Sequence, residues 1–377
     1  MDKTVILPPA VIGIIGGGQL GRMMAISARQ MGYGIAALEP GKNSPLAQIS
    51  DMEINRPYDD VSALDQLTRL ADVLTYEFEN IPAKTIENLE ELAKIPQGAR
   101  PLAISQHRLV EKKAINECGF KTAPFEEVSD EAQFKKALSI IGYPSILKTC
   151  QGGYDGKGQW ALHSAEDVAK VTEIVGKIPC VLEGFVDFEM EISVIVTRSR
   201  NGEIQTFPAI ENIHNNHILH LSIVPARIPS TLAQLAEQTA KSLIEGLGFV
   251  GTLAIEMFVV GDEVIINEMA PRPHNSGHLT IDAFNVSQFD QHIRAICGLP
   301  LLKPELKSPA VMVNLLGQHV DYTLDMWQQP KFAEGFLHLY GKEENKKDRK
   351  VGHITFTNES MEDVLSLTED FLAGFPQ

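Results

Sequence analysis

The chain has 377 residues, of which 44% are hydrophobic and 22% are charged, a composition typical of a globular protein and not of a disordered or fibrous one. At roughly 150 residues per domain, this length indicates two or three domains. The formal net charge of −16 argues against nucleic-acid binding, which requires a large basic surface. The four cysteines form no CxxC pair, so neither a disulfide framework nor a cysteine-based zinc site is indicated. No segment approaches the roughly 18 uninterrupted apolar residues of a membrane span, and we expect a cytoplasmic protein.

The first hundred residues alternate short apolar runs with amphipathic stretches. Strands are predicted over 11–15, 34–38 and 73–78, and helices over 19–31, 61–70 and 84–94. Strand and helix in alternation form a parallel sheet through right-handed crossovers, so we predict a Rossmann-like domain over residues 1–103. A helix over 105–118 follows the proline-rich segment "KIPQGARPLAI".

A glycine motif, "GIIGGGQLGRM", follows the first strand. It contains Gly16, Gly18 and Gly21 in GxGxxG spacing, and Glu39 stands at the end of the second strand. This is the dinucleotide fingerprint, with an acidic residue placed for a ribose hydroxyl. The alternative is that any first strand-to-helix turn of such a fold favours glycine. The motif alone therefore leaves NAD binding open.

The middle of the chain continues the alternation and then changes pattern. The strand "PSILKTC" runs into the glycine loop "GGYDGKGQ" at residues 152–159. Two hairpins are then predicted, around Asn201-Gly202 and around Gly261-Asp262, because strand periodicity flanks each turn signal. Short strands and the basic loop "GKEENKKDRKVGH" follow residue 300. We predict a mixed fold, α/β with α+β character, in which antiparallel sheet follows parallel sheet.

Two carboxylates in the second hairpin form a candidate metal site. With a two-residue loop, Glu256 would face Asn267, and Glu256 and Glu268 would point to opposite sides. With a three-residue loop, 261–263, Glu256 lies directly across from Glu268. The metal hypothesis therefore predicts the longer loop, and two carboxylates suit Mg²⁺ that completes its shell with phosphates and water. The alternative is a pair of solvated glutamates.

Two lysines precede and occupy the glycine loop. Lys148 ends an apolar strand, where a buried ammonium requires an anionic partner. Lys157 lies in the loop, whose glycines would let backbone N–H groups close over phosphate oxygens. A Gly-Lys-Gly turn alone is weak evidence. Its position between the lysine strand and the dicarboxylate hairpin strengthens the prediction of a nucleotide site.

These features together resemble the ATP-grasp superfamily. The strings "GGYDGKGQ", "YEFEN", "APRPHNSGH" and "DRKVGH" resemble the N5-carboxyaminoimidazole ribonucleotide synthetase family of purine biosynthesis, over about residues 11–355. The resemblance implies an ATP-grasp domain over 104–300 with a lid subdomain at about 121–186, and a small β-rich domain over 301–377. It also implies a homodimer. The net charge and the lack of a long apolar segment predict no nucleic-acid or membrane partner.

The resemblance further implies an ATP site between two antiparallel sheets. Backbone groups of 183–186 would contact adenine, Glu191 the ribose, and the loop 153–159 the phosphates. The residues that match the family's nucleotide contacts are Arg108, Lys148, Gly153, Tyr154, Asp155, Gly156, Lys157, Gly158, Gln159, Glu183, Gly184, Phe185, Val186, Glu191, His214, Asn267 and Glu268. Glu256 and Glu268 would hold Mg²⁺, or Mn²⁺ in its place.

The implied reaction phosphorylates bicarbonate to carboxyphosphate and carboxylates the amine of aminoimidazole ribonucleotide, releasing ADP and phosphate. Such phosphoryl transfer requires charge neutralisation and alignment. The residues that match the catalytic positions are Arg272, His274, Asn275, Lys157 and Asp155. Those that match the ribonucleotide contacts are Gln19, Leu20, Glu77, Asn80, Tyr154, Asp155, Lys342, Arg349 and Lys350. Three alternatives stay open: another ATP-grasp ligase, an NAD-dependent oxidoreductase, and a nucleotide sensor without turnover.

Overall fold

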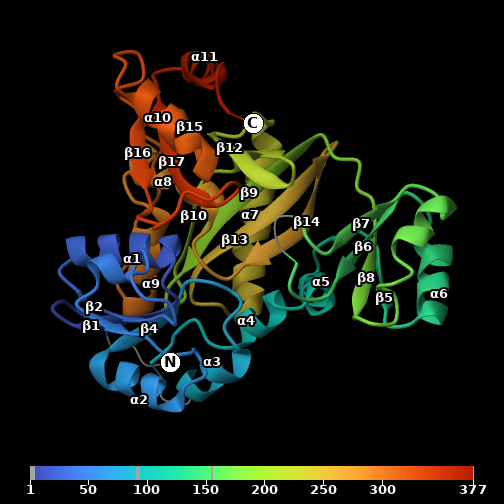
Figure 1. The fold of residues 1–377 in the computed structure, drawn as a ribbon, viewed down its shortest axis with the longest axis horizontal. Helices are drawn as coiled ribbons and strands as arrows, with labels where there is room; N and C mark the ends of the chain where they lie inside the picture. The colour runs from blue at the N-terminus through green and yellow to red at the C-terminus, as the bar shows by residue number, and fades with distance from the viewer. Residues whose placement is uncertain (1–4, 91–93, 154–155, 377) are drawn as a thin grey trace.

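The computed structural model describes residues 5–90, 94–153 and 156–376. A long central sheet, which includes the C-terminal strands, lies next to the N-terminal unit, and a small lobe projects to one side (Figure 1). The mixed class predicted from the sequence, with parallel sheet first and antiparallel sheet after it, is confirmed.

Four parallel strands form the first sheet, in the order β3-β2-β1-β4. Its strands are β1 (Val11–Ile15), β2 (Gly34–Leu38), β3 (Met52–Ile54) and β4 (Val73–Tyr76). The helices that alternate with them are α1 (Gln19–Gln30), α2 (Val61–Leu70) and α3 (Ala83–Glu90). Strand β3 was not predicted, because three residues are too few to show a period. Strand β4 ends two residues earlier than predicted, where Glu77 turns toward helix α1.

The core of this first unit is completed by a helix from far along the chain. Helix α9 (Gln288–Cys297) packs beside α1 and buries Phe289 and Ile293 against Met24 and Ile12. Helix α2 covers the opposite face of the sheet through Leu64 and Leu67. The first unit and the segment around residue 290 therefore share one hydrophobic core.

The helix predicted over 105–118 is α5 (Arg108–Glu117), and a helix that was not predicted, α4 (Arg100–Ser105), lies in the proline-rich segment before it. His107 has extended backbone angles, and the Arg108 N–H donates to the carbonyl of Cys150, which separates the two. Pro101 does not prevent helix α4 from forming, because proline is tolerated in the first turn of a helix.

The projecting lobe, residues 121–186, is called the lid below. Its sheet has the order β5-β8-β6-β7, and every pairing is antiparallel. The strands are β5 (Phe125–Val128), β6 (Ser145–Thr149), β7 (Gln159–Leu162) and β8 (Cys180–Gly184). Helix α6 (Glu131–Ile141) packs Phe134 and Ala137 against this sheet. Strands and a helix alternate along the lid as they do in the first unit, but in the lid they form an antiparallel sheet.

The central sheet has nine strands in the order β14-β13-β9-β11-β12-β15-β17-β16, with β10 beside β9. They are β9 (Met190–Arg198), β10 (Ile204–Thr206), β11 (Ile210–Asn215), β12 (Ile218–Val224), β13 (Gly251–Val260), β14 (Glu263–Ala270), β15 (Ala310–Leu316), β16 (Phe336–Leu339) and β17 (Lys350–Thr357). Both predicted hairpins are confirmed. The C-terminal strands join this sheet through β12 and β15, and β15 and β17 are longer than predicted. The domain limits at residues 103 and 300 stay a prediction.

Helices cover the central sheet on both faces. They are α7 (Ser230–Leu247), α8 (Thr280–Ala283), α10 (Val320–Trp327) and α11 (Met361–Leu372). Helix α7 buries Leu243 and Ile244 against β9 and β13, whereas α11 packs Phe371 on β15 and β17. Across the parts of the chain that the structure describes, no helix has both the length and the apolar character needed to cross a membrane.

Candidate active site

The dicarboxylate hairpin joins β13 and β14. Glu256 lies directly across from Glu268, as the metal hypothesis required. The predicted three-residue loop is wrong, because Val260 pairs with Glu263 and only Gly261 and Asp262 form the turn. A bulge restores the register: Met257 pairs with Ile266 and Glu256 with Glu268, so Asn267 is an extra residue in β14. The bulge therefore brings the two carboxylates to the same side.

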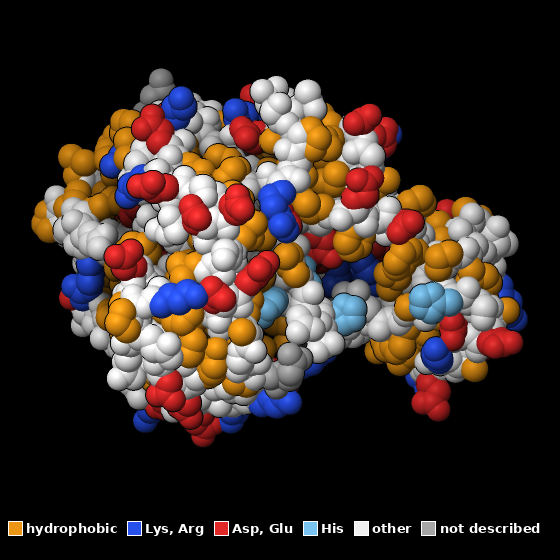
Figure 2. Space-filling view, turned by 90° about the horizontal axis from the view of Figure 1, so that it is seen from above, with side chains coloured by type: hydrophobic (Ala, Val, Ile, Leu, Met, Phe, Trp, Pro, Cys, Tyr) orange, Lys and Arg blue, Asp and Glu red, His pale blue; other side chains and the backbone are white. Residues whose placement is uncertain are grey.

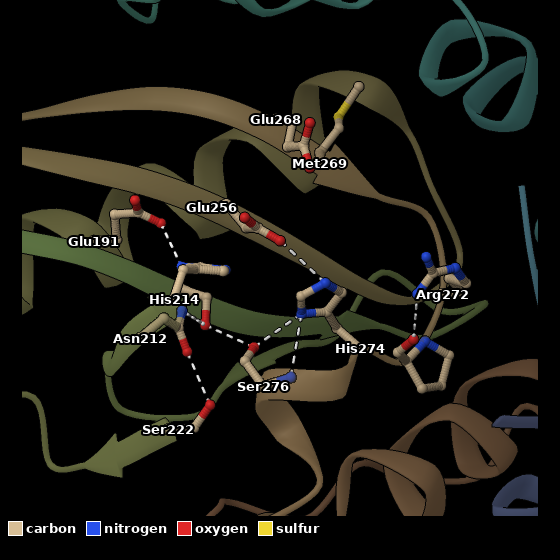
Figure 3. Close-up of polar contacts among 12 residues, drawn as sticks. Glu191, Asn212, His214, Ser222, Glu256, Glu268, Met269, Arg272, His274 and Ser276 are labelled. Atoms are coloured by element: carbon tan, nitrogen blue, oxygen red, sulfur yellow. Dashed lines mark hydrogen bonds and ion pairs between the residues drawn. The ribbon is translucent and has the colours of Figure 1, made fainter. Parts of the chain in front are cut away.

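Each of these carboxylates has a cationic or polar partner. Arg108 Nη1 lies 3.0 Å from Glu268 Oε2. His274 Nε2 lies 3.0 Å from Glu256 Oε1 (Figure 3). Burial raises the pKa of Glu268, but Arg108 and Lys148 outweigh it, and the pKa is lower than usual. Glu268 is therefore ionised, which is the form that binds cations.

A buried group of charges lies between the lid and helix α5. Lys148 Nζ and Lys112 Nζ lie 2.9 and 3.2 Å from Glu183 Oε2. Burial raises the pKa of Glu183, yet the two lysines hold it below its usual value, so the carboxylate is ionised. Sequence reasoning missed Lys112, whose one signal was its spacing of three residues from the buried Leu109 and Ile115.

Glu111 also faces the hairpin and was not predicted. It is 3% exposed, and its Oε1 accepts a hydrogen bond of 2.7 Å from the Met269 N–H. Burial, with the nearby Glu268, raises the pKa of Glu111 to about 8. This contact fixes the backbone next to Glu268 to helix α5.

His214 of β11 and Glu191 of β9 contact each other. Their place beside the nucleotide stays a prediction. His214 Nδ1 lies 2.8 Å from Glu191 Oε2 (Figure 3). Burial lowers the pKa of His214, but the carboxylate outweighs it and the pKa is raised. The pair lies on the same sheet as Glu256, since β9 is the direct neighbour of β13.

A chain of polar side chains orients His274. Its Nδ1 lies 2.9 Å from Ser276 Oγ, which lies 2.8 Å from Ser193 Oγ. Asn212 Nδ2 donates to the same Ser193 oxygen at 2.9 Å, and Ser222 Oγ donates to Asn212 Oδ1 at 3.0 Å. These supporting residues were not predicted, because they come from four separate segments. They leave Nε2 of His274 directed at Glu256 (Figure 3).

The glycine loop lies between β6 and β7. Tyr154 and Asp155 lie outside the described residues. Gly156 has φ +77°, and a Cβ there would lie 2.7 Å from His217, which sits in the β11–β12 turn. The Gly158 carbonyl accepts from the Thr149 N–H at 2.9 Å. The loop is therefore close to the central sheet on the side of His214.

The segment 183–186, which is predicted to contact adenine, begins within strand β8 and continues past its end. The N–H groups of Gly184 and Phe185 already donate to the carbonyls of Pro124 and Pro144, at 2.8 and 3.1 Å. The Glu183 side chain is committed to the lysines described above. Adenine recognition here would therefore use the other backbone groups of the segment. A hollow separates the lid from the rest of the molecule, and Lys or Arg side chains are visible inside it (Figure 2).

A cavity of about 220 Å³ joins the first unit to the segment after β14. It is lined by Gly18, Gln19, Leu20, Glu77, Phe78, Glu79, Asn80, Arg272, His274, Asn275 and Lys350. Five of the predicted ribonucleotide contacts, Lys350 among them, and three predicted catalytic residues thus meet in one place. Lys342 and Arg349 do not line it. Lys342 instead donates to the Lys350 carbonyl at 2.5 Å.

The cavity wall contains an arginine–glutamate ion pair and an amide without hydrogen-bond partners. Arg272 binds Glu79 through two hydrogen bonds of 2.5 and 2.9 Å, and although burial opposes it, this contact lowers the pKa of Glu79 to about 2. Glu79 was not predicted, although it lies within the quoted "YEFEN". Asn275 is 9% exposed, and neither side-chain polar atom has a hydrogen-bond partner. An amide left without partners in a cavity wall is typical of a ligand site.

The glycine motif binds a carboxylate from its own chain. Glu77 accepts hydrogen bonds from the Gly18 N–H and, at 2.6 Å, from the Gly21 N–H. A Cβ on Gly18 would lie 2.7 Å from Glu77 Oε1. The carboxylate occupies the helix N-terminus where a dinucleotide phosphate would bind. The Glu39 carboxylate, which a dinucleotide site would use to bind a ribose hydroxyl, accepts a hydrogen bond from the Tyr58 hydroxyl.

The closeness of Glu77 to the glycine motif predicts that a side chain at Gly16 will strongly destabilise the fold. In Gly16→Ala, the new Cβ would lie 2.3 Å from Glu77 Cγ, and Gly16 has φ +109°. We expect a loss of about 1–2 kcal/mol from the backbone conformation and about 1–3 kcal/mol more from the clash. Urea unfolding measures the sum. Gly142→Ala is the control, because Gly142 has φ +78° with nothing within 4 Å of its Cβ position. Equal losses in the two variants would contradict the clash.

Comparison with known proteins agrees with this geometry. Three family models match consecutive stretches: a ribonucleotide synthetase preATP-grasp domain over 10–106, an ATP-grasp domain over 113–289, and a phosphoribosylaminoimidazole carboxylase C-terminal domain over 310–367. The N5-carboxyaminoimidazole ribonucleotide synthase of Bacillus subtilis (strain 168) is 50% identical over 357 residues, which cover 94% of this chain and 93% of the relative.

Two solved structures are similar over nearly the whole chain. The ADP complex of an N5-carboxyaminoimidazole ribonucleotide synthetase has a TM-score of 0.95 at 50% identity and covers 98% of each chain. The enzyme of Aspergillus clavatus, solved with ADP and 5-aminoimidazole ribonucleotide, has a TM-score of 0.89 at 29% identity, with 97% of this chain and 98% of that chain covered. The chain therefore belongs to the N5-carboxyaminoimidazole ribonucleotide synthase family of ATP-grasp ligases.

Proposed function

We propose that this protein uses ATP to carboxylate the exocyclic amine of 5-aminoimidazole ribonucleotide with bicarbonate, forming N5-carboxyaminoimidazole ribonucleotide in purine biosynthesis. Family membership supports the ligase activity and the use of ATP. The observation that carries the substrate assignment is the 220 Å³ cavity, because it joins Gln19, Glu77 and Asn80 of the first unit to Arg272 and the rest of its segment.

ATP would lie between the lid sheet and the central sheet. Lys148 and Arg108 supply positive charge there, and both lie against carboxylates that are ionised. The glycine loop at 153–159 would close over the phosphates, and Lys157 of this loop would reach the transferring group. Glu191 would bind the ribose hydroxyls, and His214 lies beside it.

Glu256 and Glu268 would hold Mg²⁺. The donor set fits this ion, since two facing carboxylates offer hard oxygen ligands and Asn267 lies beside them in the bulge. When bound, the ion would neutralise charge on the phosphate oxygens. Mn²⁺ accepts the same ligands. The chain's own Arg108 contributes by holding the Glu268 carboxylate ionised, because it lowers the pKa of that group.

Bicarbonate is a poor electrophile, and we infer that it is activated as carboxyphosphate by the γ-phosphoryl group of ATP. Arg272, His274 and Asn275 would hold bicarbonate and the transferring group. Glu79 orients the Arg272 guanidinium, and the serine chain orients His274. The amide of Asn275 has unused donors and an unused acceptor in the cavity wall. Such fixed dipoles stabilise developing charge without reorganising during the reaction.

The ribonucleotide would bind across the cavity from this segment. Gln19, Leu20 and Asn80, which line the cavity, would contact its ring and ribose, and Lys350 would contact its 5′-phosphate. Tyr154 and Asp155 are proposed as contacts from the glycine loop. We also propose a homodimer in the cytoplasm, as is usual in this family, and sedimentation of the purified protein tests the dimer.

A bicarbonate-dependent ADP assay tests the function. The purified protein should release ADP from ATP only when both bicarbonate and 5-aminoimidazole ribonucleotide are present, and ¹⁴C-bicarbonate should enter the nucleotide product. ADP release indifferent to the ribonucleotide would reject the substrate assignment. Saturable NADH binding in the micromolar range would favour the oxidoreductase alternative.

Lys342 gives this function a predicted pH dependence. Burial, with Arg349 and Lys350 nearby, lowers the pKa of Lys342 to about 8. If its ammonium helps to hold the 5′-phosphate, kcat/KM for the ribonucleotide will fall up to tenfold per pH unit above about pH 8, because kcat/KM reports groups of the free enzyme. The Lys342→Arg variant should lose this decline, since arginine does not titrate there. A decline identical in both proteins would assign it to another group.

The same lowered pKa affects stability in the opposite direction. An unfolded lysine keeps its proton up to about pH 10.4, so between pH 8 and that value the unfolded chain binds more protons than the folded one. The contribution of Lys342 to the free energy of unfolding therefore rises with pH in this window. The fall in kcat/KM is thus distinguishable from unfolding.

A further inference from the structure

A second group of metal-ligating side chains lies away from the carboxylates of the hairpin. Asp282 of α8, His338 of β16 and His353 of β17 each offer a ligand atom, and these atoms lie within 4.8 Å of one another. His338 Nε2 is 3.0 Å from Asp282 Oδ2. His338 and His353 are direct partners across the two strands, and their rings are stacked with centroids 4.6 Å apart.

The buried imidazole in this group has an unused nitrogen. His353 is 0% exposed, its Nδ1 lies 3.0 Å from the Tyr340 hydroxyl, and its Nε2 has no hydrogen-bond partner. His278, 5.0 Å away between ring centroids, is equally buried, and its Nε2 also lacks a partner. Burial holds the pKa of both rings well below the usual value, so both are neutral at pH 7. A neutral imidazole with a free lone pair is the form that binds a metal ion.

The group has access to solvent on one side. The His338 side chain is 33% exposed and lines a groove of about 590 Å³ together with Trp327, Phe336 and Thr357. Asp282 is 8% exposed in its side chain and His353 is fully buried, so two ligands lie inside and one lies at the surface. An ion could therefore enter from the groove, and water could complete its coordination from the same side.

We propose that Asp282, His338 and His353 bind a divalent transition-metal ion of the zinc class. Two imidazoles and a carboxylate are ligands that Zn²⁺, Co²⁺ and Ni²⁺ share, whereas Mg²⁺ prefers oxygen alone. Ligand atoms around a tetrahedral zinc ion lie about 3.3 Å apart, as bonds of about 2.0 Å require. The Asp282–His338 distance already fits this spacing. Side-chain rotation would bring the remaining pairs closer.

The site would connect two walls of the ribonucleotide cavity. Helix α8 follows the segment that carries Arg272, His274 and Asn275, and β17 begins at Lys350. A bound ion would fasten these walls to each other from behind without touching the substrate. Its expected effect is therefore on stability, because an ion that binds only the folded chain shifts the unfolding equilibrium.

Metal titration of the full-length protein tests this proposal. The protein is treated with chelator, dialysed, and kept with millimolar Mg²⁺ and ADP so that the hairpin carboxylates are saturated. Co²⁺ is then added while visible absorption, metal content and melting temperature are measured. We expect one Co²⁺ per chain with imidazole-type d–d bands, displacement by Zn²⁺, and a raised melting temperature.

Single substitutions identify the ligands. His338→Ala and Asp282→Asn should each weaken Co²⁺ binding at least about tenfold and abolish the rise in melting temperature. His163→Ala, an exposed histidine in the lid, should change neither. Circular dichroism checks that each variant is folded, and His338 is the safer position because it is partly exposed.

A fluorescence measurement gives an independent answer. The chain has two tryptophans, and Trp160→Phe leaves Trp327, which lines the same groove as His338. Ni²⁺ should quench the remaining emission with the affinity found for Co²⁺, and His338→Ala should prevent it. If Co²⁺ binding and quenching are the same with and without His338 and Asp282, or if no binding remains under saturating Mg²⁺, the proposal is wrong and the cluster is an ion pair beside a buried histidine.

Discussion

Glu268→Gln will reduce ribonucleotide-dependent ADP release by at least about 1,000-fold, a loss of the size seen when one preorganised charge is removed from a transition state. Glu268 lies across from Glu256 and pairs with Arg108 at 3.0 Å. The amide keeps the shape but removes one anionic ligand from the proposed Mg²⁺ site. It also leaves Arg108 without its partner. Initial rates at several Mg²⁺ concentrations measure the effect, which higher Mg²⁺ should partly relieve.

Glu263→Gln is the matched control. Glu263 lies in the same strand, but its carboxylate pairs with Lys121 at the exposed end of the hairpin. Exposed ion pairs contribute little, so its rate and stability should be close to those of the unchanged protein. Full turnover in Glu268→Gln would exclude the carboxylate pair from catalysis. A nucleotide sensor would show no turnover in either protein.

Arg272→Ala will lower kcat by about 100- to 1,000-fold while leaving the KM for ATP nearly unchanged. The guanidinium lines the 220 Å³ cavity and is held by Glu79 through two hydrogen bonds. It is not among the residues proposed to contact the nucleotide. Its removal takes away positive charge where the transferring group would be. Steady-state kinetics with each substrate varied in turn separates the two effects.

Arg227→Ala provides the comparison for this variant. Arg227 also binds a carboxylate through two hydrogen bonds, to Glu211, but it does not line the cavity. Its loss should leave kcat unchanged and affect stability alone. If the two variants lose activity equally, the effect of Arg272 is structural.

The hairpin shows how far a sequence pattern reaches. Alternation located both strands and both glutamates, and the predicted pairing of Glu256 with Glu268 is confirmed. The loop length was wrong because a bulge is not visible in a pattern of period two. One extra residue in β14 has the same effect on facing side chains as one extra residue in the turn.

The predicted residues that reached the cavity are those whose motifs sit at strand ends, such as Asn80 and Arg272. Their supporting partners were not predictable, because Lys112, Ser193 and Ser222 come from separate elements and lie in none of the quoted motifs. Contacts between distant segments depend on packing, which a single sequence does not display. Glu79 is different: it lay within a quoted motif, and only its contact with Arg272 distinguishes it from its neighbours.

The glycine motif shows the opposite error. Its spacing is that of a dinucleotide site, yet Gly18 and Gly21 donate to Glu77. The physical requirement, close approach of an anion to a helix N-terminus, is the same in both cases. A sequence reveals that requirement but not whether the anion belongs to a ligand or to the chain.

The packing of α9 on the first sheet has a consequence for synthesis on the ribosome. The strands of the first unit are complete by Tyr76, but Phe289 and Ile293 cover the face that holds Ile12 and Met24. At about 5–20 residues per second, the ribosome needs at least ten seconds to add the intervening chain. During that time an apolar face is open to water. Until α9 has been synthesised, the N-terminal unit of the nascent protein therefore presents an apolar surface that can aggregate or bind chaperones.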